Sequence, residues 1–201
     1  MGRAPSEKLG YPTTWTTPSQ ARLGGLLEVT HGAVSYGPWP FKVTLRAGWS
    51  QPFEYWPAMG FTTMDGSQVA IDVVHDHDMD DRIAMDFDHL LEEALDARGI
   101  RLVRMREIHL ATDRKVVIAR QMARYVGTSV PAEDAEQLRG LIGRHGGRMT
   151  LGQIRTSGED GVLRMAQACV LGMRRRLLLG LDVGGLAAST VSLCGFEGGA
   201  A

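Results

Sequence analysis

The chain has 201 residues, of which 44% are hydrophobic and 22% are charged, and this content supports a globular core in one ordinary domain or two small ones. Residues 1–100 contain 7 Lys and Arg against 14 Asp and Glu, a net charge of −7, whereas residues 101–201 contain 15 against 9, a net charge of +6. The composition excludes a disordered chain. The asymmetry of charge indicates two modules. The basic module is suited to binding nucleic acid, or it merely has a positively charged surface.

The ends of the chain read as flexible segments. Residues 1–20 are rich in Pro, Thr, Ser and Gly, and residues 196–201 read FEGGAA. The first 14 residues contain no apolar run of signal-peptide length, and no segment reaches the roughly 18 apolar residues of a membrane span. We therefore expect a cytoplasmic protein without a membrane partner.

A β-rich region follows the N-terminal segment. The runs Phe41–Leu45, Tyr55–Thr63 and Val69–Val74 have the composition of strands. Asp65 and Gly66 lie between the last two runs, and an Asp-Gly pair in that position is a strong signal for an antiparallel hairpin.

A crossover unit is predicted next. Apolar residues recur at helical spacing between Ile83 and Leu95, Gly99 is placed to end that helix, and Ile100–Val103 resumes as a strand. A strand, a helix and a second strand of these lengths predict two parallel strands. The expected fold class is therefore α/β, with a mixed sheet flanked by helices.

The last third of the chain predicts three helices and two strands. One helix begins at Pro131, Thr150 caps a short second helix that runs to Ile154, and Gly161–Met173 forms a third. Leu177–Asp182 and Ser189–Leu193 read as two strands around a tight turn. This order is typical of a winged helix-turn-helix domain.

A cluster of His and Asp residues follows the strand Val69–Val74. Asp72, His75, His77 and Asp78 are candidate metal ligands, because imidazole and carboxylate groups bind zinc and iron. The spacing departs from the HxHxDH pattern, which requires Asp and His where this chain has Met79 and Asp80. The preferred interpretation is a solvated loop before a helix, and the two cysteines, Cys169 and Cys194, lack the CxxC spacing of a zinc site or a disulfide framework.

Three stretches carry a resemblance to a known family. Tyr55–Val74 resembles a tyrosine-x-Pro-Asp motif followed by a strand, an Asp-Gly turn and a Glu-x-Lys strand. Pro38–Val43 resembles a preceding Gln-Pro-Phe segment, and Leu26–Tyr36 resembles a Leu-Leu-Glu lead-in. With the order of elements, these stretches resemble the TnsA-like endonuclease subunit of heteromeric transposases, which belongs to the PD-(D/E)XK nucleases.

The resemblance implies a restriction-endonuclease-like domain over residues 21–128 and a C-terminal winged helix over residues 129–195. It also implies Mg²⁺ as the cofactor of active members, and DNA and a transposase or other mobile-element protein as partners. The catalytic positions of the family fall on four residues here, namely Gln20, Ala58, Asp72 and Val74.

These positions do not supply the family's chemistry. Ala58 cannot hold a divalent ion, Val74 cannot orient a water molecule, and a single carboxylate at Asp72 cannot do both. We therefore expect no catalytic residues and no cofactor. The function that this favours is a catalytically degenerate subunit that binds DNA or a transposase.

Two alternatives stay open. One is an active metal-dependent DNA endonuclease with a relocated site around Asp72 and His75–Asp78. The other is a protein-interaction module that does not bind DNA. If the winged helix does bind DNA, the candidate contacts are arginines on and around its third helix. The alternative interpretation is that these arginines interact only with the helix dipole. These arginines are Arg155, Arg164, Arg174, Arg175 and Arg176.

Overall fold

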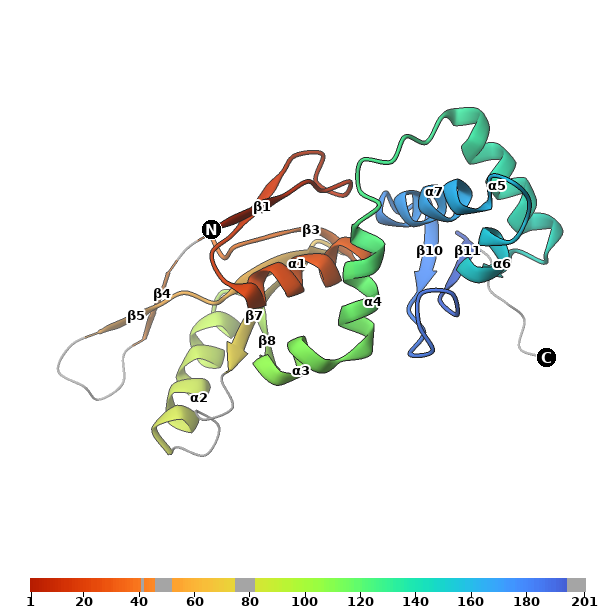
Figure 1. Cartoon of the computed structure of the whole chain (residues 1–201). Coiled ribbons are helices and arrows are strands. Elements are labelled where there is room, and N and C mark those ends of the chain that lie inside the picture. The colour runs from red at the N-terminus through yellow and green to blue at the C-terminus, as the bar shows by residue number, and fades with distance from the viewer. Residues whose placement is uncertain (41, 46–51, 75–81, 195–201) are drawn as a thin grey trace. The chain divides into compact units, whose positions relative to one another are not determined.

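The computed structural model of the chain contains one mixed four-stranded sheet (Figure 1). Its strands, in the order β3-β6-β7-β8, are β3 (Ala33–Gly37), β6 (Met59–Thr63), β7 (Gln68–Val74) and β8 (Ile100–Arg106). The structure describes residues 1–40, 42–45, 52–74 and 82–194. The pairs β3–β6 and β6–β7 are antiparallel, whereas β7 and β8 are parallel. Helix α2 (Arg82–Asp96) connects the parallel strands, so the predicted α/β class and the crossover are confirmed.

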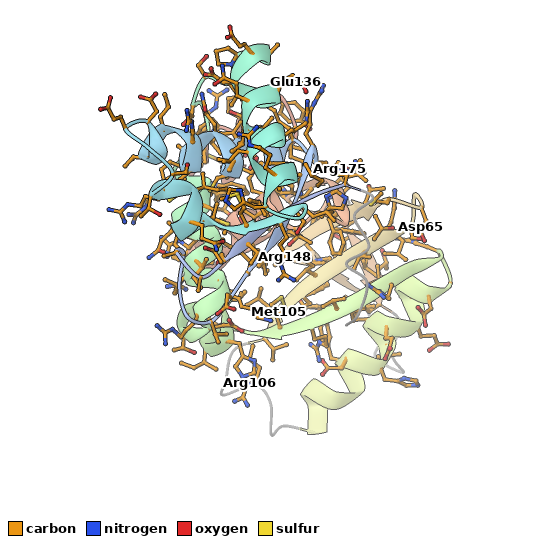
Figure 2. The ribbon with its side chains drawn as sticks, turned by 90° about the vertical axis from the view of Figure 1, so that its right-hand side faces the viewer. Asp65, Met105, Arg106, Glu136, Arg148 and Arg175 are labelled. Atoms are coloured by element: carbon orange, nitrogen blue, oxygen red, sulfur yellow. The ribbon has the colours of Figure 1, made fainter. Side chains whose placement is uncertain are left out.

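The hairpin between β6 and β7 turns at Asp65 and Gly66, as the sequence predicted. Gly66 has φ +86°, and Asp65 accepts a hydrogen bond of 3.1 Å from the Ser67 N–H. Figure 2 shows Asp65 at this end of the hairpin. The Thr63 hydroxyl and the Ser67 N–H together hold the pKa of the Asp65 carboxyl below its usual value, because both donate to the charged form.

The core between the sheet and α2 explains the helical spacing in the sequence. Leu91 and Leu95 of α2 are fully buried against Ala70 of β7 and Ile100 of β8, whereas the intervening Glu92 is exposed. Burying one apolar stripe in this way stabilises the helix on the sheet. The partners that complete this core are Trp39, Val43 and Leu45.

The predicted strand over residues 55–63 is in fact two strands. β5 (Phe53–Tyr55) pairs with β4 (Val43–Leu45) in a separate two-stranded sheet, and β6 starts only at Met59. Pro57 lies between them and has no N–H to donate to a ladder, which accounts for the break.

The N-terminal residues differ from the flexible segment that the sequence predicted over residues 1–20. β1 (Gly2–Ala4) pairs antiparallel with β2 (Thr13–Trp15), and α1 (Pro18–Val29) begins within the same range. Trp15 accounts for this order, because its buried ring stacks on Tyr36 and lies against Gly24, where an added Cβ would come within 2.3 Å of the ring. The predicted tail over residues 196–201 lies outside the described residues.

The chain divides into two units at different positions from those predicted. The first unit comprises Met1–Ala4, Thr13–Leu27 and Gly32–Asp113, and the second comprises Pro5–Pro12, Glu28–His31 and the chain from Arg114 onward. The sequence placed the division near residue 128. Two helices that it did not identify, α3 (Glu107–Thr112) and α4 (Arg114–Ala123), lie on either side of the observed division, and the apolar face of α4 packs in the second unit.

The second unit contains helices α5 (Ala132–Arg144), α6 (Leu151–Arg155) and α7 (Gly161–Met173). Its three-stranded antiparallel sheet has the order β10 (Leu177–Gly180), β11 (Thr190–Leu193), β9 (Arg148–Thr150). Thr150 caps α6 in a full capping box with Gln153, as predicted. The sequence did not predict β9, and residues 181–189 between the last two strands form a longer connection than the predicted tight turn.

The interior of the second unit is apolar and includes all but a few positions of α7. Its largest fully buried side chains are Met122, Leu138, Ile142, Leu151, Ile154 and Met173. Cys169 lies in the same interior, and burial raises the pKa of its thiol to about 12. Among the described helices, none is both long and apolar enough for a membrane crossing.

Candidate functional site

Asp72 is the residue that the sequence placed at a catalytic position and that retains a carboxylate. It lies on β7, an interior strand of the mixed sheet, and only 2% of its surface is exposed. The Tyr55 hydroxyl donates to Oδ1 over 2.5 Å, and Nη2 of Arg104 donates to Oδ2 over 3.2 Å. Both carboxylate oxygens are therefore engaged by protein donors.

Arg104 reaches Asp72 because of the strand register. The two residues are direct partners in the parallel ladder of β7 and β8, so their side chains extend from the same face of the sheet. The guanidinium also forms an ion pair with Asp88 of α2. One cation thus lies between two carboxylates, and sequence reasoning identified neither Arg104 nor Asp88 because they lie 16 or more positions away from Asp72.

Gln20 and Ala58, two other positions assigned by the resemblance, lie together in the first unit. Nε2 of Gln20 donates to the Ala58 carbonyl over 2.9 Å. Its Oε1 accepts from the backbone N–H and the hydroxyl of Thr16, both over 2.7 Å, at the start of α1. Gln20 therefore links the start of α1 to the chain just before β6. Its Nε2 donates to the Ala58 carbonyl, and an ionised carboxylate at this position could not donate such a hydrogen bond.

Val74 follows Asp72 by two residues on β7 and shares its face of the sheet. It is 8% exposed and offers no group that could move a proton. The predicted metal candidates His75, His77 and Asp78 lie outside the described residues. Within residues 1–40, 42–45, 52–74 and 82–194, no three His, Cys, Asp or Glu side chains are grouped closely enough to hold a metal ion.

The arginines predicted to contact DNA lie at several places in the second unit. Arg155 ends α6 and is exposed, as is Arg176. Arg164 is half-buried on α7 and donates to the Ser157 carbonyl over 3.3 Å. Arg174 pairs with Glu7 over 2.8 Å, and Arg175 lies beside it in the turn after α7.

The surface of α7 is mostly apolar. Arg164 is its one basic residue, and Val162 and Leu163 are 60% and 49% exposed at its first turn. The helix can therefore present basic groups only at its ends. Gly161 begins the helix where an added Cβ would lie 1.9 Å from the Arg155 carbonyl oxygen, so only glycine permits this close approach of α6 and α7.

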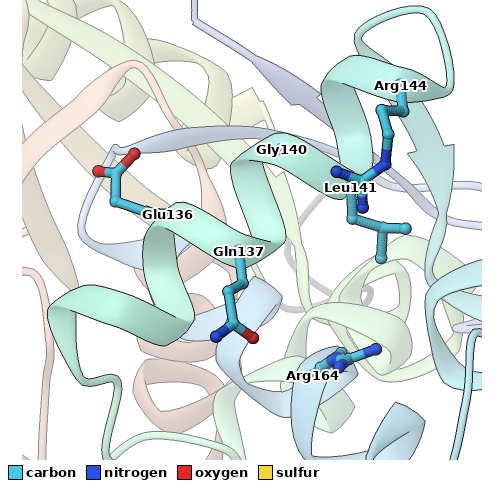
Figure 3. Close-up of a pocket in the computed structure, with 6 residues that line it drawn as sticks. All are labelled: Glu136, Gln137, Gly140, Leu141, Arg144 and Arg164. Atoms are coloured by element: carbon cyan, nitrogen blue, oxygen red, sulfur yellow. The ribbon is translucent and has the colours of Figure 1, made fainter.

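A shallow pocket of about 240 Å³ lies between α5 and the first part of α7 (Figure 3). Gln137 and Leu141 extend toward the side where Arg164 lies, whereas Glu136 points away from it. The sequence analysis did not identify this pocket. Its lining residues are Glu136, Gln137, Gly140, Leu141, Arg144 and Arg164.

Comparisons of the sequence with protein-family models and with curated proteins found no match.

Proposed function

We propose that the chain is a catalytically degenerate, TnsA-like protein that binds DNA or a transposase partner as a structural or regulatory subunit. The observation that carries this proposal is the environment of Asp72, where the Tyr55 hydroxyl and the Arg104 guanidinium engage both carboxylate oxygens. In this proposal the first unit keeps a nuclease-like fold without nuclease chemistry.

The order of elements supports a restriction-endonuclease-like fold for the first unit. A helix, an antiparallel β3-β6-β7 meander, a crossover helix and a parallel strand follow one another along the chain. In the second unit the order α5-β9-α6-α7-β10-β11, with its antiparallel sheet, supports a winged helix. The resemblance implies both of these folds.

The charges around Asp72 support the loss of catalysis. A Mg²⁺ ion needs several oxygen ligands in near-octahedral geometry. At this position Arg104 already supplies the positive charge, and a metal ion would have to displace a guanidinium held by both Asp72 and Asp88. Ala58 contributes a methyl group and a carbonyl already bonded to Gln20. The side chains present favour a stable polar network over metal binding.

A cleavage assay tests this proposal. Purified full-length protein is incubated with supercoiled and linear DNA in Mg²⁺ or Mn²⁺, and we expect no nicking or cutting. Metal-dependent nicking that disappears in Asp72→Ala would overturn the degenerate assignment. The variant His75→Ala with His77→Ala is the matched comparison: nicking lost in both variants would identify the relocated site, and nicking lost in Asp72→Ala alone would identify the family's own position.

DNA binding is tested by a mobility shift at several salt concentrations. Arg155 and Arg176 are exposed, so Arg155→Ala and Arg176→Ala should weaken binding and lower the salt slope by about one unit per lost phosphate contact. Arg139→Ala is the control, because Arg139 is held by an ion pair with Glu136 on α5. A slope that is the same in all three variants would exclude these contacts.

A second candidate function is a protein-interaction module. It is favoured by the exposed Val162 and Leu163 at the first turn of α7, since apolar side chains suit a protein surface better than a phosphate backbone. If the full-length protein shows no affinity for duplex DNA even at low salt, this alternative replaces DNA binding.

A further inference from the structure

Two segments of the second unit meet at the buried carboxylate of Glu28, and a third joins them through Glu7. This residue is 2% exposed, and it accepts hydrogen bonds from the Ser6 hydroxyl over 2.7 Å and from the N–H groups of Glu7 and Lys8 over 2.8 and 3.1 Å. Nζ of Lys8 donates to the Thr30 carbonyl over 2.6 Å. The Lys8 ammonium is therefore fixed next to His31.

The third segment is the turn after α7. Glu7 accepts from Nε of Arg174 over 2.8 Å and from the Gly127 N–H over 2.7 Å, so residues 7 and 8 are fixed to the chain at residues 174 and 175. Lys8, His31 and Arg175 are thus brought together by contacts of their immediate neighbours. Figure 2 labels Arg175, which lies just beyond the end of this helix.

Arg175 has an unusual backbone conformation. Its φ of 60° makes it the one non-glycine residue with positive φ in the described part of the chain. Glycine commonly occupies this left-handed position after a helix, because it has no Cβ to clash. Backbone strain of this kind often accompanies a functional side chain. The side chain that the turn presents here is a guanidinium.

The cluster is rich in cations. Three cations, Lys8, Arg174 and Arg175, face two carboxylates, Glu7 and Glu28. Nε of Arg175 and Nδ1 of His31 are buried without a hydrogen-bond partner among the described residues. Cations and two buried polar nitrogens are therefore gathered in one place.

The pKa shifts of His31 and Lys8 reflect burial and the positive charges around them. Burial lowers the pKa of His31, and the positive charges of Arg175 and Lys8 lower it further. Burial lowers the pKa of Lys8 to about 8, with Glu28 opposing the shift and Arg175 adding to it. The carbonyls at the end of α7 do not exclude an anion, since they accept the N–H groups of residues 174–176.

We propose that Lys8, His31 and Arg175 form a binding site for a phosphate group. The guanidinium and the ammonium supply charge-assisted donors, and His31 adds a ring nitrogen. The phosphate comes either from a nucleic-acid backbone or from a free phosphate ion. The site does not depend on the proposed function, whereas DNA as its source rests on that function.

Inorganic phosphate is the first probe. Titration of the full-length protein, followed by calorimetry and by the NMR signal of the His31 ring, should show saturable binding, and bound phosphate should raise the pKa of His31. Arg175→Gly should lower the affinity for phosphate at least tenfold. It should preserve the fold, because glycine tolerates the φ of this position. Arg139→Ala is the control and should bind as the wild type does, because Arg139 is held by an ion pair with Glu136 on α5. Equal phosphate affinity in the wild type and Arg175→Gly, or no binding at all, would overturn the site.

Duplex DNA at low salt is the second probe and identifies the source. If Arg175→Gly weakens both phosphate and DNA and lowers the DNA salt slope by about one unit, the site holds a backbone phosphate. If Arg175→Gly weakens the binding of phosphate but not of DNA, the ligand is a free phosphate ion. DNA binding that survives while phosphate never binds would overturn this site and leave the proposed function intact.

Discussion

Arg104 lies directly opposite Asp72 in the parallel ladder of β7 and β8, and it joins that buried carboxylate to Asp88 on α2. A carboxylate that is 2% exposed loses nearly all of its hydration, so it depends on a neighbouring cation and on hydrogen-bond donors. Asp72, Arg104 and Asp88 therefore connect β7, β8 and α2.

Removing the cation should therefore destabilise the first unit. Arg104→Ala leaves the Asp72 charge buried with the Tyr55 hydroxyl as its remaining partner, and we expect the free energy of unfolding in urea to fall by about 2 to 3 kcal/mol. The loss stays below that of a fully buried pair because 28% of the Arg104 side chain is exposed. Arg101→Ala, on the exposed side of the same strand, should change stability by no more than about 0.5 kcal/mol. Equal losses in the two variants would contradict this role.

Gly60 on β6 lies beneath the ring of Trp39. An added Cβ would come within 2.3 Å of Cε3 of that ring, and Trp39 is itself buried in the core under α2. Gly60→Ala should therefore lower the free energy of unfolding by about 1 to 3 kcal/mol, because the core would have to move aside.

Gly37 provides the control for this substitution. It is the direct partner of Gly60 in the β3–β6 ladder, and an added Cβ would meet nothing within 4 Å. Gly37→Ala should leave stability unchanged or slightly raised, since alanine restricts the unfolded chain. The two variants are compared by urea unfolding, and similar stabilities would show that Trp39 does not limit the space above Gly60.

Local signals in the sequence predicted much of the fold. The Asp65-Gly66 turn, the amphipathic spacing of α2 and the capping residue Thr150 each depend on residues within a few positions, and the structure has all three. Their physical cause is local, because turn geometry, helical periodicity and capping hydrogen bonds involve neighbouring residues.

The contacts around Asp72 could not be predicted in the same way. Tyr55 and Arg104 are 17 and 32 positions from Asp72, and they meet it only through the register of β7 and β8 and the separate pairing of β4 and β5. A register change of one residue would turn each side chain to the opposite face. The strands β1 and β2 were missed for a related reason, because short Gly- and Thr-containing strands have no periodic signal of their own.

Lys8 supplies the last prediction, which concerns stability against pH. Burial lowers the pKa of its ammonium from 10.5 to about 8, with Glu28 opposing the shift and Arg175 adding to it. His31, Glu7 and Arg174 are the other charged or titratable groups of this cluster. Between pH 8 and 10.5 the unfolded chain binds this proton and the folded chain does not. The free energy of unfolding should therefore gain a contribution that rises with pH across this window, whereas below pH 8 the penalty of the buried charge is fully present.

Two substitutions of similar length isolate this effect. Lys8→Met carries no charge at any pH, and Lys8→Arg keeps its charge throughout the window. Relative to Lys8→Met, the wild type should become more stable from pH 8 to pH 10 in phosphate-free urea titrations, while Lys8→Arg should show no such rise. Added phosphate should move the rise to higher pH, because a bound anion favours the charged ammonium. A wild-type profile parallel to that of Lys8→Met would mean that the Lys8 ammonium keeps its full affinity for the proton in the folded protein.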